Sequence, residues 1–221
     1  MDAIQKFWNE KEVVKRFANR DHDDRLEKFI HRFKSPSEVR ILDLGCAGGR
    51  NTVFLAREGF DVWAVDFSQA MVKETRKRLF EMMGERVATR VVEGRMENLS
   101  WIPDKFFDII LALGLYHNAQ SEEQLRVALK ESSRILKPHG WLYSSSFMPG
   151  TVLRGQRLDP VPGHSFLYFG VDGDRACLLN AEQWDREMAK AGLFKSLPHE
   201  VAKGESDRSL RISLYSFYQK K

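Results

Sequence analysis

The sequence predicts a doubly wound α/β fold with a mostly parallel sheet. Short runs rich in aliphatic and β-branched residues alternate with amphipathic stretches of helical period. Several of the short runs are apolar throughout, which is typical of parallel strands that are covered on both faces. The expected strands span residues 39–44, 61–65, 87–92, 107–113 and 140–147.

Helix-start and helix-stop signals separate these strands. Ser68 and Ser121 precede two of the amphipathic stretches, and Gln124 follows Ser121 at the spacing of a capping box. Gly59 and Gly84 stand where two of the stretches end. The expected helices span residues 50–58, 69–83, 122–136 and 180–191.

The two ends of the chain depart from this alternation. Residues 2–33 are helix-like, and residues 149–179 are rich in glycine and proline and are expected to form a long irregular insertion. Two β-rich stretches at the C-terminus predict a hairpin that adds an antiparallel strand to a seven-stranded sheet with helices on both faces. We expect a single domain with an N-terminal helical cap, a core, a substrate-side insertion and a C-terminal helix and hairpin at residues 1–36, 37–147, 148–180 and 181–221.

Length and composition fit one globular domain. The chain has 221 residues, of which 43% are hydrophobic and 30% charged. Its two cysteines provide neither a disulfide framework nor metal-ligand spacing, so no metal is expected. No apolar run approaches the length of a membrane span, and the first residues lack the order of a signal peptide, so a cytoplasmic protein is expected. The net charge of +4 comes from 35 basic and 31 acidic residues that are interspersed, as on solvated helix faces.

A glycine-rich turn follows the first expected strand, in the segment from Asp43 to Arg50. Glycines at a strand-to-helix turn let the backbone approach a ligand closely. A dinucleotide fingerprint would require further glycines at Ala47 and Arg50, so an NAD-dependent oxidoreductase is disfavoured. The acidic Asp43 instead suits a ligand that carries a positive amine.

A second acidic residue ends the next expected strand. Asp66 stands where a carboxylate can accept both hydroxyl groups of a ribose. Phe67 beside it and Met71 one helical turn later could enclose a purine ring. Together with Asp43 and the glycine turn, these residues describe a site for an adenosine that carries an amino-acid tail.

The chain resembles the class I S-adenosylmethionine-dependent methyltransferases in five segments that occur in the family's order and spacing. They are Asp43–Gly49, Asp66 at its strand end, Glu93–Leu99, Phe107–Leu113 and Arg134–Gly140. The resemblance implies the Rossmann-like methyltransferase fold, S-adenosylmethionine as cofactor and S-adenosylhomocysteine as product.

The resemblance also implies a set of cofactor-binding residues. They are Asp43, Gly45, Cys46, Ala47, Gly49, Asn51, Asp66, Phe67, Ser68, Met71, Arg95, Met96, Glu97, Leu113 and Gly114. Two positions depart from the family pattern. Ala47 stands where the family usually has glycine, and Arg95 stands where it commonly has an aspartate that binds the adenine amine.

Methyl transfer from a sulfonium needs positioning and desolvation more than acid–base chemistry. The resemblance places the segment after the fourth strand beside the methyl group, so Tyr116 and His117 are the candidate catalytic residues. His117 could act as a base if its pKa stays near the ordinary value of about 6.5. Tyr116 could equally be a packing residue, and for His117 a structural or substrate-contact role is favoured over catalysis.

The expected acceptor is a small molecule. The segment after the fourth strand contains no Asn-Pro-Pro-Tyr-like tetrapeptide and no Pro-Cys pair, and no RNA-binding module is visible. The N-terminal helical segment and the insertion both carry bulky aromatic residues, which favour an enclosed pocket. Two alternatives remain: a tRNA or protein methyltransferase, and a non-catalytic module that binds S-adenosylmethionine. The acceptor and the oligomeric state are left open.

Overall fold

A computed structural model describes residues 3–221, which divide into two compact units. The first unit comprises the chain up to Arg95 together with Phe107–Ile110. The second comprises Met96–Phe106 and Leu111–Lys221. Strand β4 (Phe107–Leu113) contributes residues to both units.

The first unit is built on parallel strands that lie in the order β3-β2-β1. They are β1 (Arg40–Leu44), β2 (Asp61–Asp66) and β3 (Val91–Glu93). Strands β1 and β2 pair in parallel from one end of β1 to the other. Their aliphatic side chains are almost completely buried, as expected for strands covered on both faces.

Helices α4 (Arg50–Arg57) and α5 (Gln69–Met83) lie beside these strands. Both were expected from the sequence, and the Ser68 hydroxyl caps α5 by accepting the backbone N–H of Met71. The strand expected over residues 87–92 is wrong at residues 87–90. Residues Gly84–Arg86 form a 3₁₀ turn (η2), and α6 (Val87–Arg90) precedes β3. The Arg76 side chain donates to the Ala88 carbonyl oxygen, which stabilises this compact conformation despite the β-branched residues.

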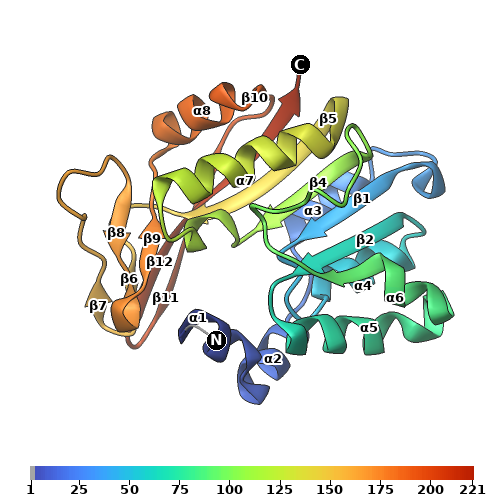
Figure 1. Ribbon diagram of the computed structural model, residues 1–221, viewed down its shortest axis with the longest axis horizontal. Coiled ribbons are helices and arrows are strands. Elements are labelled where there is room, and N and C mark those ends of the chain that lie inside the picture. The colour runs from blue at the N-terminus through green and yellow to red at the C-terminus, as the bar shows by residue number, and fades with distance from the viewer. Residues whose placement is uncertain (1–2) are drawn as a thin grey trace. The chain divides into compact units, whose positions relative to one another are not determined.

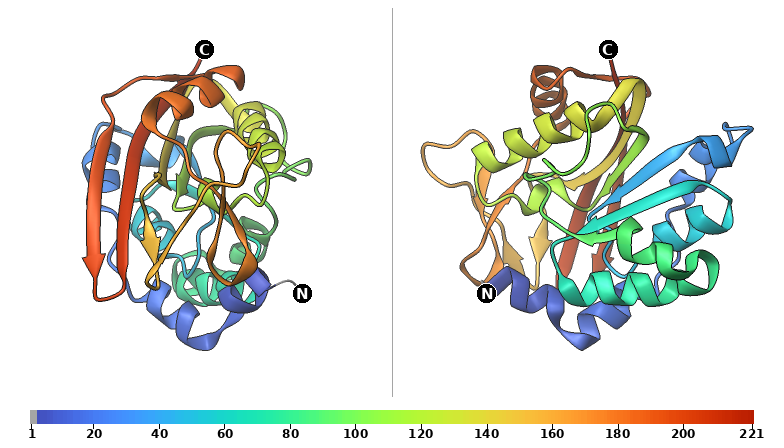
Figure 2. Two further views of the ribbon diagram at one scale, coloured as in Figure 1. Left: turned by 90° about the vertical axis from the view of Figure 1, so that its left-hand side faces the viewer. Right: turned by 45° about the vertical axis from the view of Figure 1, so that its right-hand side comes forward.

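The helix-like N-terminal segment forms three short helices. They are α1 (Ala3–Asn9), α2 (Lys11–Ala18) and α3 (Asp24–Ile30), and a 3₁₀ turn η1 (Pro36–Glu38) follows them. Asp23 starts α3 by accepting the backbone N–H groups of Arg25 and Leu26. Figure 2 shows α1 and α2 beside α5, which they contact.

The second unit has an antiparallel sheet around two long strands, β5 (Leu136–Phe147) and β12 (Ser209–Lys220). Strands β10 (Leu193–Lys195) and β11 (Glu200–Ser206) both pair with β12. Helix α7 (Glu122–Ile135) runs along β5, and α8 (Ala181–Lys190) packs next to β10 (Figure 1). The predicted C-terminal hairpin is confirmed, with its turn between Ser206 and Ser209.

The expected irregular insertion is ordered in the structure. It contains two small antiparallel pairs, β6 (Val152–Leu153) with β7 (Gln156–Arg157), and β8 (Leu167–Phe169) with β9 (Arg175–Cys177). A 3₁₀ turn η4 (Val171–Gly173) connects β8 to β9. Phe166 and Leu178 are buried, so this segment has apolar packing of its own.

The predicted fold class is confirmed: the strands of the first unit are parallel, helices accompany them, and antiparallel strands close the C-terminus. Among residues 3–221 the main sheet has ten strands rather than seven, because the insertion and the C-terminus add short antiparallel strands to it, and β8 and β9 form a separate pair. No helix in the described part of the chain is both long and apolar enough to cross a membrane. Across the same residues, no group of three or more His, Cys, Asp or Glu side chains is arranged to hold a metal ion.

Candidate functional site

Two carboxylates meet at the carboxyl edge of the parallel strands in the first unit. Asp43 is the penultimate residue of β1 and Asp66 is the last residue of β2. The backbone N–H of Gly45 donates to the Val65 carbonyl oxygen at 2.8 Å, so the glycine turn begins directly beside the end of β2. The sheet register therefore brings the two predicted ligand-binding acids and the turn together.

Asp66 is held by the backbone on both sides. Its Oδ2 accepts the N–H of Ala47 at 2.8 Å, and its Oδ1 accepts the N–H of Ser68 at 2.9 Å. Burial raises the pKa of this carboxyl to about 6, although these backbone hydrogen bonds act in the opposite direction. The negative charge of Asp43 raises it further.

Asp43 is buried in the same way. Burial raises the pKa of its carboxyl to about 6, against the lowering effect of a hydrogen bond from Thr52 and of the Arg50 charge. The Thr52 hydroxyl donates to Oδ2 of Asp43 at 2.6 Å. Two buried, mutually repelling carboxylates form a site that a positive or hydroxyl-bearing ligand would stabilise.

The turn between β1 and α4 uses left-handed backbone at three positions, with φ values of 77° at Gly45, 48° at Ala47 and 77° at Gly49. The family's preference for glycine at position 47 thus has a physical reason, since a side chain is strained in this region. Gly49 has a second requirement, because a Cβ atom there would lie 2.7 Å from Cγ2 of Thr75.

Side chains of α5 satisfy the carbonyl groups of the turn. The Thr75 hydroxyl donates to the Ala47 carbonyl oxygen at 2.8 Å, and Nη1 of Arg78 donates to the Gly48 carbonyl oxygen at 2.6 Å. At Gly48 the backbone of α2 comes so close that a Cβ atom would lie 2.7 Å from the Cα atom of Ala18. The turn is therefore held between α5 and the N-terminal helices.

Two predicted cofactor residues have side chains engaged elsewhere. Met71 is fully buried and packs against Val13 and Val14 of α2. The Ser68 hydroxyl caps α5 and lies 3.0 Å from the Trp8 carbonyl oxygen, to which it can donate. In this structure the side chains of Met71 and Ser68 hold the N-terminal helices in place, and the expected purine contact of Met71 stays a prediction.

Other predicted residues of the first unit have identifiable contacts. The guanidinium of Arg95 lies 5.8 Å from the ring centre of Phe67, over the ring expected to contact the purine. Oδ1 of Asn51 accepts the N–H of Asp23 at 3.0 Å, which ties α4 to the start of α3. Cys46 is buried, and burial raises the pKa of its thiol well above the usual range.

The remaining predicted cofactor residues belong to the second unit. They are Met96, Glu97, Leu113 and Gly114. Glu97 accepts a hydrogen bond from Nε2 of Gln124 at 2.9 Å. The N–H of Gly114 points at the Ser145 hydroxyl oxygen at 3.0 Å, and the backbone of this exposed glycine is left-handed.

His117 does not meet the condition set for a general base. Burial lowers the pKa of its imidazole to about 3. Its Nδ1 is the acceptor for the backbone N–H of Phe147 at 3.3 Å, and the two rings stack with centres 4.1 Å apart. This places the proton of the neutral ring on Nε2. The histidine is thus a neutral, packed side chain rather than a base poised near neutral pH.

Tyr116 is also a structural residue in this arrangement. It is completely buried, its hydroxyl lies 2.8 Å from the Ser132 hydroxyl, and its ring lies against Trp184. Burial raises the pKa of its phenol above the usual range. These contacts hold the Tyr116 side chain in the interior, and its catalytic role stays a prediction.

Three polar residues that were not predicted from the sequence support the site. Thr52, Thr75 and Arg78 contact Asp43 or the turn carbonyls, but none belongs to a family segment. The signal was present at two of them. Thr52 and Thr75 are polar residues on the apolar faces of their helices, and both are completely buried.

The family comparison agrees with this geometry. Residues 41–140 match a family model described as "Methyltransferase domain". The match covers 100 of the chain's 221 residues, and over these residues the chain is similar to methyltransferase domains. The matched residues include the glycine turn and the strand ends that bear Asp43 and Asp66.

Two curated relatives each match about half of this chain. A ubiquinone biosynthesis O-methyltransferase of Rickettsia felis is 29% identical over 115 residues, which cover 52% of this chain and 44% of the relative. A glycine N-methyltransferase of Rattus norvegicus is 30% identical over 115 residues, which cover 47% of this chain and 38% of the relative. The chain thus spans less than half the length of either relative.

Solved structures share the fold of this chain over nearly its whole length. A methyltransferase of Methanosarcina mazei is similar with a TM-score of 0.70 at 16% identity, covering 91% of this chain and 99% of that one. A 1,6-didemethyltoxoflavin-N1-methyltransferase of Burkholderia thailandensis, bound to its substrate and S-adenosylhomocysteine, gives a TM-score of 0.65 at 17% identity, covering 98% and 82%.

Proposed function

We propose that this chain transfers a methyl group from S-adenosylmethionine to a small-molecule acceptor by in-line displacement. The observation that carries the proposal is the pair of buried carboxylates, Asp43 and Asp66, at the edge of the sheet beside the glycine turn. Burial disfavours both charges, so a ligand that donates hydrogen bonds or brings positive charge gains stability from this pair.

The chemistry of these side chains fits S-adenosylmethionine. Each oxygen of Asp66 accepts one backbone N–H and keeps a lone pair for one hydroxyl of a ribose. Asp43 has one oxygen occupied by Thr52 and supplies the negative charge that a ligand's ammonium group requires. The left-handed backbone at Gly45 and Ala47 permits close approach of the ligand.

When bound, the cofactor supplies a methyl group on a sulfonium, which is activated for displacement without a metal. The chain's residues would bind and orient the cofactor. Asp66 would bind the ribose, Asp43 would bind the amino-acid tail, and the backbone of the glycine turn would lie against the ligand. His117 is neutral and contributes packing next to Phe147. Positioning and exclusion of water then account for the protein's part in the reaction.

A small organic acceptor is supported by the names of the similar proteins. The Rickettsia felis relative is an O-methyltransferase of ubiquinone biosynthesis, and the Burkholderia thailandensis structure is an N1-methyltransferase that holds a small heterocycle. The acceptor class we propose is therefore a small molecule with a nucleophilic oxygen or nitrogen atom.

Calorimetric titration of the purified chain with S-adenosylmethionine, S-adenosylhomocysteine and NAD tests the cofactor. We expect micromolar binding of both adenosyl ligands and none of NAD. Radiolabelled methyl transfer to catechol, glycine, bulk tRNA and mixed protein then tests the acceptor class, with incorporation expected in a small molecule. Label on tRNA or protein would favour those acceptors, and absence of adenosyl binding would favour a non-catalytic module.

A further inference from the structure

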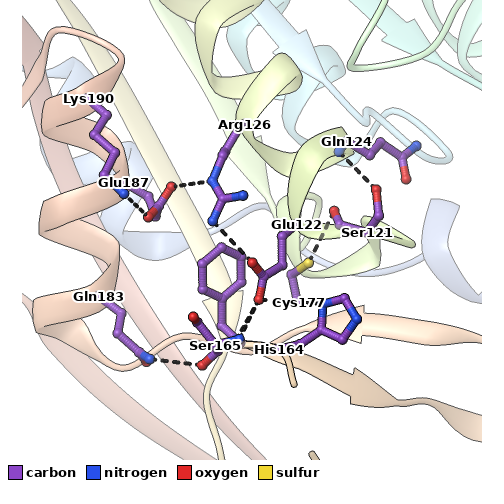
Figure 3. A network of polar contacts seen from close by, with 11 residues as sticks. Ser121, Glu122, Gln124, Arg126, His164, Ser165, Cys177, Gln183, Glu187 and Lys190 are labelled. Atoms are coloured by element: carbon purple, nitrogen blue, oxygen red, sulfur yellow. Dashed lines mark hydrogen bonds and ion pairs between the residues drawn. The ribbon is translucent and has the colours of Figure 1, made fainter. Parts of the chain in front are cut away.

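One carboxylate in the second unit holds a turn of the insertion. Oε1 of Glu122, in the first turn of α7, accepts the backbone N–H groups of Ser165 at 2.6 Å and of Phe166 at 3.0 Å (Figure 3). The ring of the adjacent His164 lies with Nδ1 3.9 Å from the same oxygen. Two successive N–H groups that converge on an anion form a small anion-binding nest.

Arg126 extends this contact to a second helix. Its Nη2 donates to Oε2 of Glu122 at 3.1 Å, and its Nε donates to Oε2 of Glu187 on α8 at 3.0 Å. Lys190 donates to the other oxygen of Glu187 at 2.6 Å. The guanidinium also lies 5.2 Å from the ring centre of Phe166. The turn is thus joined to α7 and α8 through a single charged network (Figure 3).

The electrostatics of Glu122 agree with this role. Partial burial acts to raise the pKa of its carboxyl, but the hydrogen bonds from Phe166, Ser165 and Arg126 outweigh it and lower the pKa below the ordinary value. The ionised carboxylate is therefore the form that the turn binds.

The insertion covers the segment that follows β4. Strand β9 lies against the 3₁₀ turn η3 (Tyr116–Asn118), which the family resemblance places beside the methyl group. The Gln120 side chain accepts the N–H of Arg175 and donates to its carbonyl oxygen, at 3.0 and 2.9 Å. Beside it, the completely buried thiol of Cys177 donates to the Ser121 carbonyl oxygen.

We propose that Glu122 is a latch: its carboxylate holds the insertion closed over η3, and the methyl acceptor passes when the insertion releases it. The passage of the methyl acceptor rests on the proposed function, whereas the hold of Glu122 on the insertion does not. Release of the turn from Glu122 requires two backbone N–H groups to exchange one carboxylate for water, and this exchange is local because the contacts lie at the start of α7.

The two cysteines allow opening to be measured without any substrate. Both are free and buried, Cys177 within the insertion and Cys46 in the first unit. Alkylation by iodoacetamide, quantified for each cysteine by peptide mass spectrometry, reports opening of the insertion as the rate at Cys177 relative to Cys46. Global unfolding would accelerate both rates together, so the ratio isolates local opening.

Glu122→Ala should raise this ratio at least about tenfold, because two charge-assisted hydrogen bonds are lost. Glu122→Gln retains a neutral acceptor and should give an intermediate ratio, and it serves as the main variant if the alanine chain does not fold. An unchanged ratio in both variants would overturn the latch.

Glu131→Gln is the matched control. Glu131 is a carboxylate on the same helix that accepts the backbone N–H of Leu99 and pairs with Arg134, so it resembles Glu122 in its type of contact. The segment it binds lies outside the insertion. The Cys177 ratio should therefore stay within about twofold of the unmodified chain. A rise equal to that of Glu122→Ala would mean that general loosening of α7, not release of the latch, exposes Cys177.

Turnover tests whether release of the insertion lets the methyl acceptor pass. With an acceptor that the radiolabel assay has identified, Glu122→Ala should change KM for that acceptor at least about fivefold, and the affinity for S-adenosylhomocysteine should stay within about twofold. A raised labelling ratio with unaltered acceptor kinetics would refute the gating role. If the unmodified chain methylates no acceptor, the proposed function and the gating role fail, and the labelling ratio still decides the latch.

Discussion

The backbone N–H of Ala47 donates to the carboxylate of Asp66 at 2.8 Å, and Ala47 itself has a φ of 48°. The strained residue of the glycine turn is thus bonded to the acid that ends the neighbouring strand. Because the left-handed backbone directs this N–H toward Asp66, the turn and the acid are built as one unit. A side chain at position 47 is accepted at a local cost of about 1–2 kcal/mol.

Replacing Asp66 should separate binding from stability. Asp66→Ala leaves the N–H groups of Ala47 and Ser68 without their acceptor, a loss of about 1–3 kcal/mol for each buried donor. It also removes a buried carboxyl group whose pKa is raised from 3.8 to about 6. Loss of this buried charge should increase the free energy of unfolding by about 3 kcal/mol at neutral pH. We therefore expect at least about tenfold weaker binding of S-adenosylhomocysteine, by calorimetry, with a free energy of unfolding changed by no more than about 3 kcal/mol.

Asp61→Asn provides the control for this variant. Asp61 begins the same strand and pairs with Arg40 at the opposite end, so cofactor affinity should not change. Equal loss of affinity in both variants would contradict the assignment of Asp66 to the ribose.

Acid should weaken cofactor binding and stabilise the unliganded protein. Asp43 and Asp66 have pKa values raised from 3.8 to about 6, so the folded chain binds protons more readily than the unfolded chain. Their contribution to stability is present below pH about 4 and is lost as the pH rises through about 6. Binding needs the ionised carboxylates, so affinity should rise over the same interval. Chemical denaturation and calorimetry between pH 4 and pH 8 would measure both trends, and parallel trends would refute the pKa assignment.

Gly48→Ala should destabilise the first unit. A Cβ atom at Gly48 would lie 2.7 Å from backbone atoms of Ala18, which can move only if α2 moves. We expect a loss of about 1–3 kcal/mol in the free energy of unfolding, measured with urea. Gly204→Ala is the control, because a Cβ atom there meets nothing within 4 Å. Equal effects of the two substitutions would mean that α2 does not pack on the turn.

His117→Ala should affect stability more than the pH dependence of turnover. The N–H of Phe147 loses its buried acceptor, which costs about 1–3 kcal/mol. Because the pKa of His117 is lowered to about 3, the turnover rate of the unmodified chain should show no titration near pH 6.5 that depends on this histidine. Such a titration, with turnover abolished in a folded His117→Ala chain, would restore the histidine as the base.

Local signals predicted the elements that bear the site. The turn after Leu44 and helix α5 follow from glycine placement and from Ser68, because backbone geometry and capping act over a few residues. Asp43 and Asp66 lie together in the structure because neighbouring parallel strands end at the same edge. The residue types at these strand ends indicated an adenosine with an amino-acid tail, and the family resemblance identified that ligand as S-adenosylmethionine.

Two features that were not predicted correctly depend on tertiary contacts: the start of β3 and the hydrogen-bond partner of Asp43. Val87 belongs to a helical turn because it packs into a core with Leu79 and Val91, and its β propensity is too weak to decide otherwise. The hydrogen bond between Thr52 and Asp43 joins a helix to a strand across the core. Likewise, the state of His117 follows from burial, which a sequence does not display.

The docking residues of the insertion lie outside it, on the chain just before and within α7. The Gln120 side chain forms hydrogen bonds with the backbone of Arg175, and Glu122 accepts hydrogen bonds from the backbone of Ser165 and Phe166. These hydrogen bonds therefore involve main-chain groups of the insertion and not its side chains. An insertion of different sequence could therefore replace this one and bind the same two side chains if it kept the same backbone conformation. This makes the segment a transplantable module, and Gln120 and Glu122 the residues that a chimaera has to retain.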